Sequence, residues 1–259
     1  MKITLVQSDI AWENKKTNFK KYESLLSGLS GKTDVVVLPE MFNTGFSMNS
    51  EELAEAMNGE TVVWMREVSA ETNYAILGSF IASDRGKYYN RLVFMKPDGD
   101  YCTYDKGHLF RMEKENMSYT KGNRTIIDSF KDWKFSLQIC YDLRFPVWSR
   151  NKNNGYDILV YIANWPAVRR NVWNTLLIAR AIENQCFVVG VNRIGRDENS
   201  IDYCGDTKLV DPRGNIVANT KMNTEEVITG EISLDELRAF REKFPVWLDA
   251  DNFEIISDR

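Results

Sequence analysis

Short apolar runs alternate with stretches of helical periodicity from one end of the chain to the other, and this alternation constrains the fold most. Residues 34–38 contain the unbroken apolar run Val-Val-Val-Leu, which is typical of a strand buried on both faces. Residues 14–29 instead place apolar side chains at helical spacing on one face. The repeated change between these two patterns predicts an α/β domain.

The same patterns give a series of predicted elements along the chain. Strands are expected at 3–7, 34–38, 74–82, 134–139, 157–162 and 187–193, and helices at 14–29, 61–73, 172–185 and from 233 onward. Turn residues at 97–100 and 211–215 predict two hairpins, so some strand pairs are antiparallel. Ser233 and Glu236 have capping-box spacing. Because no linker or repeat intervenes, one domain spanning 1–259 is expected, with two packed sheets and helices outside.

Charge and cysteine usage limit the class of protein. The chain carries 33 basic and 37 acidic residues, a net charge of -4, which argues against a nucleic-acid or anionic-membrane binder. No apolar run approaches the roughly 18 residues of a membrane span, and the N-terminus turns polar too early for a signal peptide. The four cysteines lie far apart without a Cys-x-x-Cys pair. A reduced, cytoplasmic protein is therefore expected.

The chain contains a single histidine, His108, and this excludes much chemistry. A site with two histidine metal ligands is ruled out, and a Ser-His or Cys-His mechanism would have to use His108. A lone histidine without metal partners is more often a hydrogen-bonded structural residue. If the protein is an enzyme, its general base is expected to be a carboxylate or a lysine.

Three polar residues follow predicted strands, where α/β proteins build their sites. Glu40 follows the run at 34–38 and is flanked by Pro39 and apolar residues, which would partly desolvate it and make it a base near neutral pH. Cys140 ends the strand at 134–139, where a sharp turn would expose a nucleophile. Lys106 follows the first hairpin and would supply a positive charge for an oxyanion. The alternatives are a solvated carboxylate, a buried structural cysteine and a surface lysine.

These residues lie in three motifs that resemble those of the nitrilase, or carbon–nitrogen hydrolase, superfamily. The motifs are Pro-Glu-Met-Phe at 39–42, Asp-Lys-x-His-Leu-Phe at 105–110 and Ile-Cys-Tyr-Asp-Leu-Arg-Phe-Pro at 139–146. Their order and spacing also agree, with 66 residues from Glu40 to Lys106 and 34 from Lys106 to Cys140. The similarity continues through residues 164–207, so it covers nearly the whole chain.

The resemblance implies a four-layer α-β-β-α sandwich whose subunits pair into a homodimer, with no cofactor and no metal. It also implies that Glu40 is the general base, Lys106 the oxyanion stabiliser and Cys140 the nucleophile. Glu115 matches a second family glutamate that orients the site, on a looser segment. The backbone N–H of Tyr141 is expected to share the oxyanion with Lys106, whose charge should also lower the pKa of Cys140.

The segments at 42–46, 108–112 and 163–173 resemble the bacterial ω-amidase branch of this superfamily. Such enzymes hydrolyse the terminal amide of 2-oxoglutaramate and 2-oxosuccinamate, small molecules that carry a carboxylate at the far end. Arg169 or Arg170 is expected to grip that carboxylate. Three aromatic residues are expected to line the pocket: Phe42, Phe46 and Trp165. The alternatives are solvated arginines and ordinary core aromatics.

Other functions remain open from the residues alone. An amidase or N-carbamoyl hydrolase for a different small carboxylate, such as deaminated glutathione, would use the same chemistry. A catalytically silent binding protein is opposed by the intact Glu40, Lys106 and Cys140. A nucleic-acid binder is opposed by the net negative charge.

Overall fold

The first of two six-stranded sheets is built mostly from the N-terminal half of the chain. The computed structural model describes residues 1–256. The sheet has the order β14-β1-β2-β3-β4-β5, with β1, β2 and β3 parallel and the other pairs antiparallel. Its strands are β1 (Lys2–Gln7), β2 (Val35–Val37), β3 (Ala75–Asp84), β4 (Lys87–Met95), β5 (Tyr101–Asp105) and β14 (Glu226–Glu231).

The second sheet repeats this arrangement with the C-terminal half of the chain. Its order is β13-β12-β9-β8-β7-β6, with β7, β8 and β9 parallel in the centre. Its strands are β6 (Ile126–Phe130), β7 (Trp133–Ile139), β8 (Ile158–Ala163), β9 (Phe187–Asn192), β12 (Lys208–Val210) and β13 (Ile216–Asn219). A separate short pair, β10 (Ile194–Arg196) and β11 (Asp202–Cys204), leaves the end of β9.

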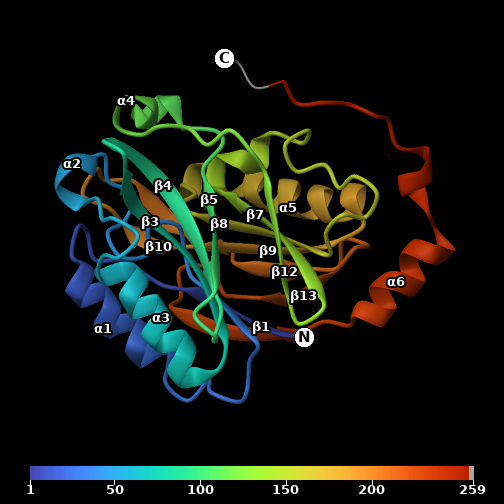
Figure 1. Cartoon of the computed structure of the whole chain (residues 1–259), viewed down its shortest axis with the longest axis horizontal. Helices are drawn as coiled ribbons and strands as arrows, with labels where there is room; N and C mark the ends of the chain where they lie inside the picture. The colour runs from blue at the N-terminus through green and yellow to red at the C-terminus, as the bar shows by residue number, and fades with distance from the viewer. Residues whose placement is uncertain (257–259) are drawn as a thin grey trace.

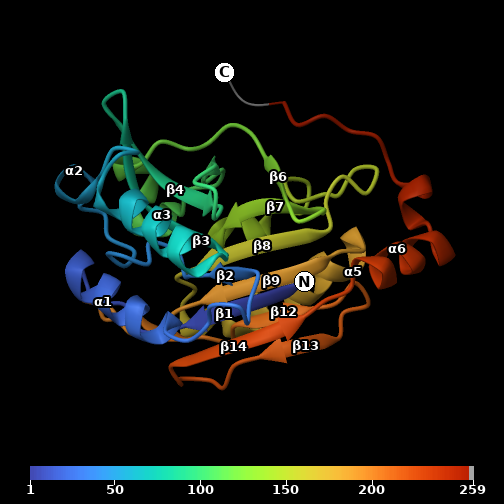
Figure 2. The same cartoon turned by 60° about the horizontal axis from the view of Figure 1, so that its bottom comes forward.

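Helices cover the outer faces of both sheets (Figures 1 and 2). The longer helices are α1 (Lys15–Leu26), α3 (Glu60–Thr72), α5 (Arg170–Asn184) and α6 (Leu234–Lys243), and the short ones are α2 (Ser50–Leu53) and α4 (Glu115–Ser118). Four 3₁₀ turns complete the elements: η1 (Arg111–Glu113), η2 (Cys140–Arg144), η3 (Ala167–Arg169) and η4 (Val246–Asp249). Helices α1 and α3 lie on the first sheet and α5 on the second, which gives the predicted α-β-β-α sandwich.

The main core lies between the two sheets, and the apolar runs of the sequence supply it. Side chains from β1, β2 and β3 meet those from β7, β8 and β9, and most are fully buried. A second core fills the space beneath α1 and α3. The predicted strands and helices are present within a few residues of their expected ends, and the Glu236 N–H donates to the Ser233 hydroxyl at the start of α6.

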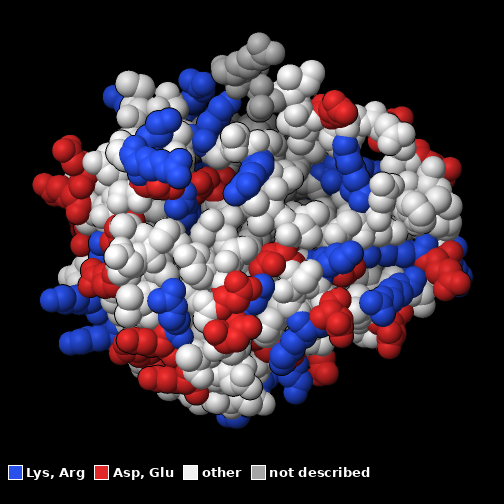
Figure 3. All heavy atoms as spheres, viewed as in Figure 1, with Lys and Arg blue, Asp and Glu red and all other residues white. Residues whose placement is uncertain are grey.

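The face of the molecule in Figure 3 carries side chains of both charges. Lysine and arginine side chains alternate with aspartate and glutamate over the face in Figure 3. In the part of the chain that the structure describes, no helix combines the length and the apolar character that crossing a bilayer requires.

Candidate active site

The carboxylate of Glu40 lies at the end of β2 and is fully buried. One of its oxygens accepts hydrogen bonds from Lys106 Nζ at 2.9 Å and from Asn90 Nδ2 at 2.7 Å. The other accepts from the backbone N–H of Asn164 at 2.7 Å. Since Asn164 directly follows β8 of the second sheet, Glu40 joins the carboxyl ends of central strands in both sheets.

Lys106 lies between two buried carboxylates. Its Nζ donates to Glu40 Oε1 and to Glu115 Oε1, both at 2.9 Å. Glu115 begins α4, and its other oxygen accepts from the N–H of Phe110 at 2.5 Å. Burial alone would lower the pKa of Lys106, but the charges of Glu115 and Glu40 outweigh it and raise that pKa above its ordinary value. Lys106 is therefore a permanent cation with one N–H left over.

Cys140 forms the predicted sharp turn between β7 and η2. Its backbone has a φ of 45°, which is unusual for a residue with a side chain and marks local strain. The thiol lies 3.9 Å from the carbonyl oxygen of Asn164. Tyr141 follows at the start of the 3₁₀ turn, where backbone N–H groups have no partner within the helix. The nucleophile candidate and a free donor are thus adjacent.

The electrostatics of the thiol differ from the sequence-based expectation. Lys106 was expected to lower the pKa of Cys140, and its charge does act in that direction. Desolvation by burial is the larger influence, however, and the nearby Glu40 carboxylate adds to it. Together they raise the pKa of Cys140 well above its ordinary value. The resting sulfur is therefore a neutral thiol whose proton must be removed during attack.

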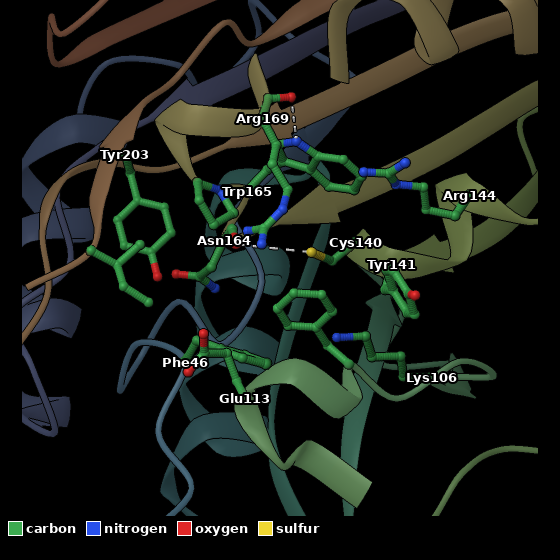
Figure 4. Close-up of a pocket in the computed structure, with 13 residues that line it drawn as sticks. Phe46, Lys106, Glu113, Cys140, Tyr141, Arg144, Asn164, Trp165, Arg169 and Tyr203 are labelled. Carbon is green, nitrogen blue, oxygen red and sulfur yellow. Dashed lines mark hydrogen bonds between the residues drawn. The ribbon is translucent and has the colours of Figure 1, made fainter. Parts of the chain in front are cut away.

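A cavity opens beside Cys140, which is one of its lining residues. Figure 4 shows Arg144, Trp165 and Arg169 on one side and Lys106 and Phe46 on the other. The remaining lining residues are Phe110, Glu113, Tyr141, Asn164, Pro166, Ile201 and Tyr203. Its lining sets a few polar groups among apolar walls, which is the arrangement typical of small-molecule sites.

Comparisons with known proteins identify the family. Residues 2–242 match the model of the carbon–nitrogen hydrolase family. The chain belongs to that family. Its members hydrolyse carbon–nitrogen bonds, so this carbon–nitrogen hydrolase acts on amides of small molecules.

Three relatives are similar to this carbon–nitrogen hydrolase over almost its whole length. The omega-amidase YafV of Escherichia coli strain K12 is 42% identical over 98% of each chain. The 2-oxoglutaramate amidase of Bacillus subtilis strain 168 is 33% identical, over 95% of this chain and 96% of the relative. The crystal structure of XC1258 from Xanthomonas campestris, a CN-hydrolase superfamily protein, is 40% identical over 98% of each chain with a TM-score of 0.96.

Two residues expected in the pocket of this carbon–nitrogen hydrolase lie elsewhere. Phe42 is fully buried in the core beneath α1 and α3, against Tyr22 and Trp64. Arg170 points away from the cavity and forms a two-pronged ion pair with Asp206, both bonds at 2.9 Å. Neither residue lines the cavity, whereas Phe46, Trp165 and Arg169 do, so of the two arginines considered only Arg169 reaches it.

Several residues of the site were not predicted from the sequence. Arg144, four residues after Cys140, lines the cavity with its guanidinium carbon 5.6 Å from the Trp165 ring centroid. Asn164 binds Glu40 through its backbone and side chain, and Tyr203 reaches the cavity from β11. Arg144 lies in the motif at 139–146 and Asn164 in the segment at 163–173. Their positions in these segments could have indicated that they belong to the site.

His108 takes the structural place that a lone histidine was expected to take. Its Nδ1 lies 2.8 Å from Asp142 Oδ1, and its ring stacks on Phe145 with centroids 3.7 Å apart. Within residues 1–256, no group of three or more His, Cys, Asp or Glu side chains is arranged to hold a metal ion.

Proposed function

We propose that Cys140, Glu40 and Lys106 carry out amide hydrolysis through a thioester. Glu40 takes the thiol proton as sulfur attacks the amide carbon, which explains how a thiol with a raised pKa becomes a nucleophile. The free N–H of Lys106 and the N–H of Tyr141 stabilise the resulting oxyanion. Glu115 keeps Lys106 in place by accepting a hydrogen bond from its Nζ.

The second half of the reaction reverses these proton transfers. When the tetrahedral intermediate collapses, the carbon–nitrogen bond breaks and Glu40 gives its proton to the departing ammonia. Glu40 then takes a proton from water, which attacks the thioester. Collapse of the second oxyanion breaks the carbon–sulfur bond, and Glu40 returns the proton to Cys140. Each proton lost by one group is accepted by the next, so the site ends unchanged.

The substrates that fit the cavity best are small acids with a terminal amide. The observation that carries this proposal is that Arg169 lines the cavity and that, within residues 1–256, its guanidinium contacts the Met112 sulfur and the Phe110 ring rather than a carboxylate. Arg144 lines the same wall, and its guanidinium lies at the Trp165 ring. A substrate carboxylate would form an ion pair with such a guanidinium. The omega-amidase and the 2-oxoglutaramate amidase to which the chain is similar support the same class, so we assign ω-amidase activity on 2-oxoglutaramate and 2-oxosuccinamate.

An ammonia-release assay over a panel of amides tests this assignment, with Arg169→Ala beside the wild type. The panel holds 2-oxoglutaramate, glutaramate, glutamine, an N-carbamoyl amino acid and butyramide. We expect the wild type to prefer the first two. Losing a charge-assisted bidentate contact costs roughly 1.5–3 kcal/mol, so Arg169→Ala should lower kcat/KM about 10- to 150-fold for these acids. Butyramide has no carboxylate to lose and should be barely affected.

Arg170→Ala is the matched control, because it removes a neighbouring guanidinium that already pairs with Asp206. It should leave the preference for acids unchanged. Equal losses on acids and on butyramide would show that Arg169 does not bind the carboxylate. A wild type that prefers neutral amides or carbamoyl compounds would overturn the ω-amidase assignment while leaving the thioester chemistry intact.

We further propose that the protein is a homodimer, as the family resemblance implies. Large apolar side chains are exposed near the C-terminal end of α6 and beside η2. Phe244 is 59% exposed, Leu248 64% and Val147 54%. A second copy that covers this patch would remove those side chains from water.

Substituting a charge into the patch tests the dimer. Leu248→Asp should convert a dimer into a monomer of about half the mass in light scattering, because a buried unpaired carboxylate opposes association. Ile256→Asp, which changes an exposed side chain outside this patch, is the control and should stay dimeric. A wild type that is monomeric at all concentrations would contradict the proposal.

A further inference from the structure

Asp142 joins the two loops that carry the reacting groups, although its own side chain does not line the cavity. It is fully buried in η2, two residues after Cys140. Its Oδ1 accepts from the backbone N–H of His108 at 2.9 Å and from His108 Nδ1 at 2.8 Å. Its Oδ2 accepts from the N–H of Ile139 at 3.0 Å and from the Tyr104 hydroxyl at 2.6 Å.

These four bonds connect the segment around Cys140 to the segment around Lys106. Ile139 directly precedes Cys140, whose strained backbone needs support from its surroundings. His108 lies two residues after Lys106, and Tyr104 lies two before it. One carboxylate therefore fixes the backbone just before Cys140 and binds residues on both sides of Lys106.

Tyr104 extends the connection to the residue after Lys106. Its hydroxyl donates to Asp142 and accepts from the Gly107 N–H at 3.0 Å and from Trp148 Nε1 at 2.9 Å. Gly107 has no room for a side chain, because a Cβ there would lie 2.6 Å from the Trp148 ring. The backbone of Gly107 is thus fixed by hydrogen bonds on one side and by an indole ring on the other.

We propose that Asp142 is a positioning residue that holds the two oxyanion donors, Lys106 Nζ and the Tyr141 N–H, at a fixed separation. The inference rests on the proposed roles of these two groups. Within residues 1–256 this buried carboxylate has no lysine or arginine partner, and four hydrogen-bond donors satisfy it instead. The conformation of the Cys140 turn and that of the Lys106 loop are then set by the same group.

Asp142→Asn tests the proposal because it keeps the shape of the side chain. Both oxygens of Asp142 accept two donors, so the new NH₂ group meets two donors whichever way the amide is turned. Misaligned oxyanion donors should lower kcat by about 10²-fold, the cost of losing one such donor. KM for the best ω-amide should change less than about threefold, because the arginine wall is untouched.

Binding of butyraldehyde supplies a readout that does not need turnover. The Cys140 sulfur adds to the aldehyde carbon, its proton passes to Glu40, and the resulting oxyanion occupies the space between Lys106 and Tyr141. Asp142→Asn should raise the Kd for this adduct by about the factor by which kcat falls, on the order of 10²-fold. Cys140→Ala is the control that shows whether the measured binding is the covalent adduct, because this variant cannot form it.

Asp157→Asn controls for damage to the fold. Asp157 is a buried carboxylate at the opposite end of β8 from Asn164, and it binds Arg241 and the Lys134 N–H. The Asp157→Asn variant should lose thermal stability but keep the kcat and the aldehyde affinity of the wild type. If Asp142→Asn does not fold, Tyr104→Phe removes one of the four donors and should give an intermediate loss of about tenfold in both readouts.

The outcomes separate the two proposals. If Asp142→Asn behaves like Asp157→Asn, with lower stability but unchanged kcat and aldehyde affinity, the positioning role is overturned. If the wild type hydrolyses none of the amides, the proposed function fails, and the aldehyde affinities of the two variants still decide whether Asp142 positions the donors.

Discussion

Cys140→Ser is expected to abolish steady-state amide hydrolysis, with kcat falling by at least about 10³-fold. A hydroxyl is a far weaker nucleophile than a thiolate, and the desolvated site that already raises the pKa of the thiol would disfavour an alkoxide still more. The fold should survive, because the replacement is nearly isosteric. Ammonia release under saturating substrate and a thermal melt measure the two quantities.

Cys102→Ser is the matched control for this prediction. Cys102 lies in β5, is partly exposed and takes no part in the site. Its replacement should leave kcat within a factor of two or three, and Cys186→Ser and Cys204→Ser should also keep substantial activity apart from a packing cost. Activity of Cys140→Ser within tenfold of the wild type would remove Cys140 from the mechanism.

Lys106→Met is expected to lower kcat by about 10²-fold or more, the cost of losing one oxyanion donor. Lys106→Arg should recover little, because the side chain is almost fully buried between Glu40 and Glu115 and a guanidinium needs more room. Steady-state kinetics on glutaramate give the comparison. Normal turnover by Lys106→Met would show that the lysine serves only to hold the two carboxylates together.

Stability must be separated from catalysis in this case, since removing Lys106 leaves two buried carboxylates without their cation. Breaking such a buried pair typically costs about 3–5 kcal/mol. The double variant Lys106→Met with Glu115→Gln removes one of the two negative charges and should recover part of that loss in a thermal melt. It should not recover activity, because the oxyanion donor is still missing.

The sequence was sufficient to predict the layers of the fold, and it also led to Glu40, Lys106 and Cys140, the reacting groups that we propose. The apolar run ending at Leu38 and the strand ending at Ile139 specify two buried strands, and polar residues directly after such strands face the edge of a sheet. That Glu40, Lys106 and Cys140 come together depends only on the order of these strands. The local pattern alone left a solvated carboxylate, a structural cysteine and a surface lysine open, and the three family motifs decided between these alternatives.

The pocket walls were harder to predict because they depend on contacts between distant segments. Phe42 stands next to the reacting carboxylate in sequence, yet it packs into the core over Gly78, where a Cβ would lie 2.7 Å from its ring. Arg170 is neutralised by Asp206, which is 36 residues away. The raised pKa of Cys140 follows from burial, and no local pattern reports burial by the opposite sheet.

The division of the site between two sheets has a consequence for heat inactivation. Glu40 and Lys106 extend from the first sheet, whereas Cys140 and Asn164 extend from the second, so the core between the sheets sets the distance between base and nucleophile. A slight loosening of that core would separate the reacting atoms while leaving the hydrogen bonds of each sheet intact. Misplacement by about 1 Å can cost 10²-fold in rate. On warming, activity should therefore disappear before the circular dichroism signal of the strands does.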